Sequence, residues 1–270
     1  MNVFKKWTIS TSFALALGGL VPGTASAVPL ELALVMDGSG SVGASGWSLQ
    51  LAGYQNAFAS GTFYDTYVAP SSYDSLWVRA YQFGTSVVEE TNWFQITDNA
   101  SATTFGNMFT VANMSYNGGL TNTEGAIQVA TNDILTNGID GAKTVIDIST
   151  DGNPTTCAGV DPHTSASCNT TADGDARLAA NAARDANITI NALGVGSGID
   201  QNYLQALVGI NPADTPTGFF LMANNFNDFA GVIQTKLGRE ITDVPEPASL
   251  ALMGLGLIGL GAARRRKKAA

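Results

Sequence analysis

The chain is poor in the side chains on which most hydrolytic and metal sites depend. Its 270 residues include one histidine, His163, and two cysteines. A Ser-His-Asp triad would need that histidine, and no Gly-x-Ser-x-Gly nucleophile elbow accompanies it. A Gly-x-x-x-x-Gly-Lys loop is also absent, which excludes nucleotide hydrolysis by that route.

Basic residues are scarce as well, and they are unevenly placed. Of 13 Lys and Arg, two stand at positions 5–6 and five at 264–268, whereas all 22 acids lie between these segments. The body therefore keeps six cations against 22 acids, a net charge of −16. Such a charge disfavours nucleic acid and anionic lipid surfaces as partners, favours cations, and also keeps an exported protein soluble.

No apolar run reaches the roughly 20 residues of an ordinary membrane span. Near the start, Lys5 and Lys6 precede a short apolar stretch at 13–21, and Ala25-Ser26-Ala27 follows it. This order is typical of a secretory signal peptide, which we expect at 1–27. The alternative, a first core helix, leaves the basic start and the small-residue end unexplained.

The C-terminus carries a second targeting signal. A linker at 241–247 contains Pro245-Glu246-Pro247, an apolar stretch follows at 248–263, and five basic residues close it. The basic end favours a cytoplasmic location for that terminus, and the apolar run has no polar face for a surface helix. The tail resembles the PEP-CTERM sorting signal, which implies a short transmembrane helix at 248–270 and processing by a membrane-embedded exosortase.

The two cysteines, Cys157 and Cys168, lie in a segment without periodicity at 151–172. An oxidising, exported setting favours a disulfide between them. A metal site that adds His163 is the alternative, but three ligands at this spacing match no zinc pattern.

Between the two targeting signals, residues 28–240 are long enough to form one domain. Apolar runs and helical periodicity alternate along it. Strands are expected at 30–36, 76–83, 87–94, 144–149, 188–194 and 219–222, and helices at 47–58, 103–111, 123–135, 173–186, 200–208 and 225–237. This alternation predicts an α/β fold with a doubly wound, mostly parallel sheet flanked by helices. Ligands of such sheets bind outside the carboxyl ends of the strands.

The first strand ends in Asp37-Gly38-Ser39-Gly40-Ser41. Glycines let the backbone turn tightly, so the carboxylate and the two hydroxyls can converge. These are hard oxygen ligands, suited to Mg²⁺, Mn²⁺ or Ca²⁺. Alone, the run could also be a turn followed by a helix cap.

Two further segments extend this pattern. Residues 118–127 place Thr121 and Thr123 before a helix, and Asp151-Gly152 follows the next strand. With the first run, they resemble the metal-ion-dependent adhesion site (MIDAS) of the von Willebrand factor A (vWA) domain, in the family's order. Residues 145–152 most resemble a group of exported bacterial vWA-like proteins of unknown function.

The resemblance implies a ligand set and a function. The implied metal ligands, which bind directly or through water, are Asp37, Ser39, Ser41, Thr121 and Asp151. Thr123 is the alternative to Thr121 for the threonine ligand. The cation, with Mg²⁺ preferred, would hold an acidic group of a protein or matrix partner, so we expect an adhesion protein of the cell envelope and not an enzyme. The alternatives are a secreted metal-dependent hydrolase, for which no suitable general base is evident, and a structural envelope protein with a vestigial site.

One acid does not belong to this set. Asp147 lies inside an apolar strand, where an unpaired charge is costly. We expect it either to support the metal site from behind or to pair with a buried cation such as Arg79.

Overall fold

The computed structural model describes residues 28–155, 171–209 and 215–242. The expected signal peptide, the segment with Cys157, His163 and Cys168, and the sorting tail from 243 lie outside these residues. No helix within the described ranges is long and apolar enough to cross a membrane.

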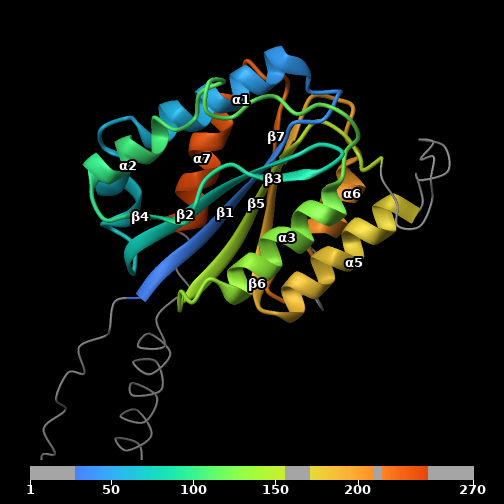
Figure 1. The fold of residues 1–270 in the computed structure, drawn as a ribbon. Coiled ribbons are helices and arrows are strands. Elements are labelled where there is room, and N and C mark those ends of the chain that lie inside the picture. The colour runs from blue at the N-terminus through green and yellow to red at the C-terminus, as the bar shows by residue number, and fades with distance from the viewer. Residues whose placement is uncertain (1–27, 156–170, 210–214, 243–270) are drawn as a thin grey trace, which may run out of the picture.

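A seven-stranded sheet forms the centre of the domain, with the order β3-β2-β1-β5-β6-β7 and with β4 also paired to β2 (Figure 1). Five of its strands run parallel: β1 (Val28–Asp37), β2 (Tyr73–Phe83), β5 (Lys143–Thr150), β6 (Ile188–Val195) and β7 (Phe220–Ala223). Four of them cover a run predicted from the sequence, β7 overlaps its predicted run at 219–222, and the expected doubly wound α/β class is confirmed.

Helices cover both faces of this sheet (Figure 1). One face is covered by α1 (Gly43–Phe58), α2 (Asn99–Gly106) and α7 (Phe229–Thr242), with a π-helical turn η1 (Tyr64–Val68). The other is covered by α3 (Thr123–Thr136), α5 (Thr171–Asp185) and α6 (Gln201–Val208). A central strand covered on both sides is apolar at nearly every position, which explains the sequence of β1.

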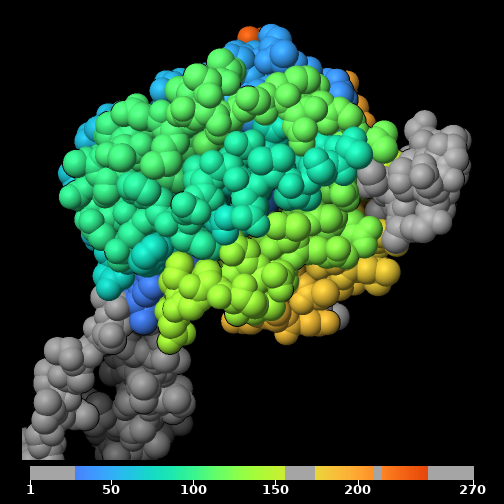
Figure 2. Space-filling model, in the orientation of Figure 1, coloured from blue at the N-terminus to red at the C-terminus, as the bar shows by residue number. Residues whose placement is uncertain are grey.

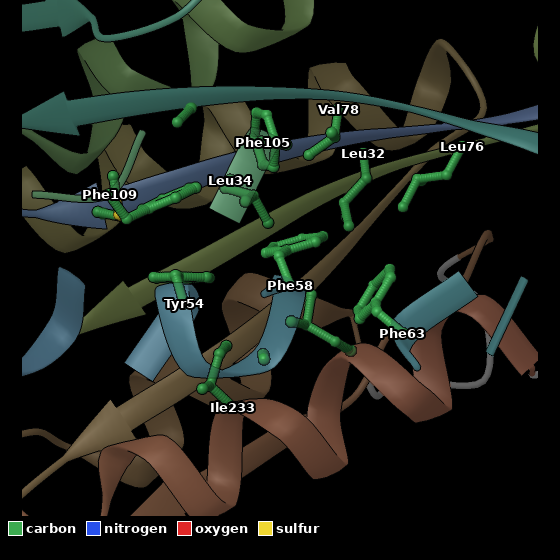
Figure 3. Close-up of a cluster of buried hydrophobic side chains, with 14 of the residues drawn as sticks. Leu32, Leu34, Tyr54, Phe58, Phe63, Leu76, Val78, Phe105, Phe109 and Ile233 are labelled. Atoms are coloured by element: carbon green, nitrogen blue, oxygen red, sulfur yellow. The ribbon is translucent and has the colours of Figure 1, made fainter. Parts of the chain in front are cut away.

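The core on the α1 side is aromatic. Leu32 and Leu34 of β1 point toward Tyr54 and Phe58 of α1, and Phe109 joins them (Figure 3). The rings of Tyr54 and Phe109 are stacked at 5.3 Å between centroids, and Phe58 meets Phe105 edge to face at 5.1 Å. The α3 side is packed with smaller residues, mainly Ala and Ile.

The predicted strand at 87–94 is wrong as a single element. It forms two short strands, β3 (Val87–Glu89) and β4 (Phe94–Ile96), both antiparallel to β2. Between them the amides of Glu90 and Thr91 both donate to the carbonyl of Ala80, while the hydroxyl of Thr91 accepts from the amide of Ala80. The side chain thus replaces a regular ladder bond, and the strand is interrupted.

Several helix boundaries also differ from the prediction. Helix α1 begins at Gly43 instead of 47, and α2 ends at Gly106 instead of 111. Helix α2 begins at Asn99 instead of 103, because Asp98 and Ser101 form a reciprocal capping box. Helix α7 begins at Phe229 instead of 225, because Asn225 accepts hydrogen bonds from the amides of Asn227 and Asp228 in a preceding turn. Its C-terminal end runs on to Thr242.

Asp147 is buried in β5 and pairs with a buried cation, as one of the two expectations held, but that cation is not Arg79. Arg79 instead pairs with Glu89 and Asp133. Asp147 faces α7, where Lys236 contacts its carboxylate and also pairs with Glu240. All three side chains are fully buried.

Candidate metal centre

The loops that follow β1 and β5 lie side by side at the carboxyl edge of the sheet, because these strands are adjacent and parallel (Figure 1). In the space-filling view, the segment that precedes α3 covers the front of this edge beside α1 (Figure 2). All three segments of the predicted motif therefore reach one place.

Direct hydrogen bonds join four of the predicted ligands. Asp37 accepts through Oδ1 from the amide of Ser39 at 2.8 Å. The hydroxyls of Ser39 and Ser41 are 3.1 Å apart, and Ser41 donates to Oδ1 of Asp151 at 2.7 Å. A continuous chain of hydrogen bonds, made mostly by side-chain oxygens, thus connects the end of β1 with the end of β5.

The third predicted segment is held in place through its main chain. The amide of Gly118 donates to the carbonyl of Gly38, and the amide of Gly40 donates to the carbonyl of Gly119, both at 2.8 Å. Gly119 has φ +86°, a conformation that L side chains rarely adopt, so glycine is required for this close approach.

Both threonines of this segment are buried, but they differ in their surroundings. The amide of Thr121 donates to the hydroxyl of Thr155 at 2.8 Å, and its carbonyl accepts from the amide of Thr155 at 3.0 Å. The hydroxyl of Thr123 is buried and has no hydrogen-bond partner within the described residues. The choice of Thr121 over Thr123 as a ligand stays a prediction.

Burial raises the pKa of both carboxyl groups in the site. It raises the pKa of Asp37 to about 6, although hydrogen bonds from Thr150 and Ser39 act in the opposite direction. It also raises the pKa of Asp151, opposed by the hydroxyl of Ser41. Within the described residues, neither acid forms an ion pair with Lys or Arg. A cation from solution would therefore relieve the cost of ionising them.

The donor set suits a hard divalent cation. It consists of two carboxylates and several hydroxyls, all oxygen donors. The described residues contain no group of three or more His, Cys, Asp or Glu that could hold a metal. A metal centre here would therefore depend on serine and threonine oxygens.

Three supporting residues were missed by the sequence analysis. Thr150 donates to Oδ2 of Asp37 at 2.6 Å and so orients that carboxylate from the neighbouring strand. Gln50 of α1 donates to the carbonyl of Asp37 and accepts from Ser149, and it thereby bridges β1 and β5. The hydroxyl of Tyr116 donates to the carbonyl of Ser39. Of these three, only Gln50 could have been suspected from the sequence, because it is a polar residue on the apolar face of a predicted helix.

Solved structures with the same fold include several vWA-type proteins. Manganese-loaded Plasmodium vivax TRAP protein matches with TM-score 0.51 and 17% identity over 77% of this chain and 73% of that one. The vWF domain of the type V pili tip protein Mfa5 from Porphyromonas gingivalis has TM-score 0.51 and 14% identity over 79% and 97%. Proximal thread matrix protein 1 from the mussel byssus, with a zinc-occupied MIDAS motif, has TM-score 0.52 and 14% identity over 79% and 48%, so this chain spans about half of it.

Comparisons of sequence identify the family. No curated protein matches the chain. Residues 243–267 match the PEP-CTERM protein-sorting motif, as the tail predicted, which indicates export and sorting. Residues 27–245 match the model of a family described as "Protein of unknown function (DUF1194)". The chain is therefore a member of the DUF1194 family with a vWA-type fold and a C-terminal PEP-CTERM sorting motif.

Proposed function

We propose that the protein is an exported binding protein that holds an acidic group of its partner through a divalent cation at the carboxyl edge of the sheet. The observation that carries the proposal is the chain of hydrogen bonds from Asp37 to Asp151, in which two acids meet hydroxyls and no basic side chain of the described residues. Such an arrangement lacks the positive charge that its carboxylates require.

The cation would be held by residues from all three loops: Asp37, Ser39, Ser41, Thr121 and Asp151. Mg²⁺ is preferred, with Mn²⁺ and Ca²⁺ as alternatives, because all of these are hard oxygen ligands. When bound, the ion would supply a positive charge for an incoming carboxylate. The manganese-loaded and zinc-occupied structures with this fold support a divalent cation in general.

We place the function at the cell envelope or in the extracellular matrix. A signal peptide at 1–27 would direct export of the vWA-like domain at 28–240. The motif at 243–267 supports recognition of the tail by an exosortase, with transient anchoring by the segment 248–270. A protein or matrix component is the expected partner, since structures with this fold include a pilus tip protein.

Binding is favoured over hydrolysis by the way the two acids are used. Asp37 accepts hydrogen bonds from Ser39 and Thr150, and Asp151 accepts one from Ser41. Both carboxylates are therefore engaged in holding the loops together. A hydrolase would need one of them, or another group, as a general base that faces the substrate.

The proposal is tested by capture of partners from the envelope fraction, with and without chelator. Wild-type protein should retain a partner in Mg²⁺, lose it on chelation and regain it when Mg²⁺ returns. Ser41→Ala should bind weakly in all conditions, whereas Ser60→Ala, an exposed serine after α1, should behave as wild type. Capture that survives both chelation and Ser41→Ala would contradict the proposal.

A further inference from the structure

A lysine and two acids are sealed inside the core between β5 and α7. The side chains of Asp147, Lys236 and Glu240 are each 0% exposed. The Nζ atom of Lys236 contacts Oδ1 of Asp147 and lies 2.7 Å from Oε1 of Glu240, to which it donates. An amine, a carboxyl group and a second carboxyl group therefore meet at one nitrogen atom.

The surroundings of this triad are apolar. In the sheet, Asp147 lies between the apolar Leu34 of β1 and Asn191 of β6, a buried amide whose oxygen accepts from the amide of Phe219. Ile233 and Leu237 of α7 belong to the buried core on the same face. Water has no access to such a site, and charges there are costly unless they are neutralised.

Two other ionisable side chains approach the triad. The hydroxyl of Tyr54 is fully buried, and the nearby acids contribute to raising its pKa, after burial itself. The amine of Lys143 donates to the main-chain carbonyl of Glu240 at 3.0 Å. Within the described part of the chain, Lys236 is therefore the one amine that reaches Asp147.

The contact between Lys236 and Asp147 differs from that of an ordinary hydrogen-bonded ion pair. Neither carboxyl oxygen of Asp147 accepts a well-aligned hydrogen bond from Lys236, although Nζ touches Oδ1. The nitrogen thus lies against the carboxyl group without the alignment of a donor. Close contact without that alignment brings an amine within reach of a carboxyl carbon.

We propose that Lys236 and Asp147 condense to an isopeptide bond that joins α7 to β5, with Glu240 as the catalytic acid and base. The bond forms between Nζ of Lys236 and Cγ of Asp147, and one C–O bond of Asp147 breaks. It is an intramolecular modification that needs no cofactor and no oxidant.

The protons and electrons of this step balance. Transfer of one proton from Nζ of Lys236 to the carboxylate of Asp147 gives an amine and a carboxylic acid, the two groups that condense. The amine attacks Cγ, Glu240 gives its proton to the departing hydroxyl, and water leaves. Glu240 then takes the proton released by the nitrogen and returns to its initial state, so the net change is loss of one water.

The state of Glu240 suits this role. Burial and the neighbouring Asp147 raise the pKa of Glu240 to about 8, although Lys236 opposes the shift. At neutral pH it therefore holds a proton that it can donate, as a carboxylic acid in an apolar site does.

The bond would connect two parts of the molecule that matter to the proposed function. This mechanical consequence rests on the proposed function, whereas the bond itself does not. Strand β5 leads to Asp151 at the carboxyl edge, and α7 is the last described helix before the sorting motif. A pull applied between a bound partner and the C-terminal segment would then pass from α7 to β5 through a covalent bond.

Peptide mapping by mass spectrometry tests the proposal without metal or partner. Trypsin should yield residues 144–177 joined to 185–239, one water lighter than their sum, from reduced and denatured protein. Cleavage after Lys236 should be lost, because an acylated lysine is not a trypsin site. Separate peptides 144–177 and 185–236 from the wild-type chain would overturn the proposal, whatever the outcome of the metal experiments.

Variants identify the reacting groups. Glu240→Gln and Asp147→Ala should both restore cleavage after Lys236 and the missing water. Asp147→Asn should give the same linked peptide, through loss of ammonia. Lys143→Arg, which changes the neighbouring lysine of the same cluster, should leave the linkage intact. A linkage that persists in Asp147→Ala would assign it to another residue, and one that persists in full in folded Glu240→Gln would overturn the role of Glu240. If Glu240→Gln does not fold, the wild-type map still decides whether the bond exists.

Discussion

Asp147 and Asp151 belong to the same stretch of chain, β5 and the residue that follows it, but their surroundings are opposite. Asp147 is fully buried and meets a lysine, whereas Asp151 is partly exposed at the sheet edge and meets a serine hydroxyl. Along one strand, the protein thus provides a cation for one acid and none, within its described residues, for the other.

The difference separates a structural charge from a functional one. A buried acid with its own cation is neutralised by the fold, so it can contribute to stability but has no need of a ligand. An acid that faces hydroxyls at an open edge is neutralised only by something from solution. The following tests change one member of this comparison at a time, in order of decreasing expected effect.

The largest effect is expected from Lys236→Met. Removing the lysine prevents the proposed cross-link and leaves Asp147 buried without a partner, and an unpaired buried charge alone typically costs about 3–5 kcal/mol of stability. Unfolding in urea, followed by tryptophan fluorescence, should show that loss, and metal affinity of the folded fraction should stay unchanged. A matched control is Lys143→Met, which removes a neighbouring lysine that donates to the main-chain carbonyl of Glu240. Equal stabilities of the two variants would show that the buried pair does not matter.

The second-largest effect is expected from Asp37→Ala, which removes the buried acid at the carboxyl edge of the sheet. Metal affinity measured by calorimetry should fall by more than about a hundredfold, beyond the loss expected for an outer-shell partner. The fold should persist, because the core of β1 is unaffected. Asp98→Ala, at the exposed cap of α2, should bind metal as the wild type does. Equal affinities of both variants would remove Asp37 from the site.

A smaller effect is expected from Thr150→Val, which keeps the shape of the side chain and deletes its hydrogen bond to Asp37. Loss of a residue that orients a metal ligand typically costs about ten- to a hundredfold in affinity. Calorimetry with Mg²⁺ and Mn²⁺ measures this change. Thr144→Val, at the far end of β5, should have no effect, and an unchanged affinity of Thr150→Val would show that Asp37 needs no orientation from β5.

Acidification should weaken metal binding with a midpoint near the pKa of Asp37. Because burial raises that pKa to about 6, protons compete with the metal below it, and the affinity should fall about tenfold for each further pH unit. Without metal the sign reverses: the folded state holds the proton more tightly, so this contribution to stability is present at low pH and is lost as pH rises through 6. The rise in melting temperature caused by Mg²⁺ should therefore be larger at pH 7.5 than at pH 5, and an equal rise at both values would contradict this.

Salt should have the smallest effect. The body's net charge of −16 repels an acidic partner at long range, and this repulsion is screened beyond about 8 Å at physiological ionic strength. Binding through a metal–carboxylate contact should then change less than about tenfold between low and moderate salt, and association should become faster. A steep fall of affinity with added NaCl would indicate a basic partner surface instead.

The pattern of apolar runs was sufficient to predict five of the strands and the class of the fold. A strand buried on both faces must be apolar along its length, so β1 and β5 are visible in the sequence. Helix ends and the β3–β4 interruption were missed, because they depend on single side-chain bonds such as those of Thr91 and Ser101. These bonds compete locally with the regular pattern.

For the site, the sequence alone determined which groups are available: an acid and two hydroxyls after one strand, and a second acid after another. The position of these groups in the sequence is sufficient to identify them, because they follow directly after the ends of predicted strands. Only the tertiary structure decided that Thr150 holds Asp37 and that Lys236, far along the chain, meets Asp147. Such pairings arise from the packing of β5 against β1 and α7, and packing partners far apart in sequence leave no local pattern that could reveal them.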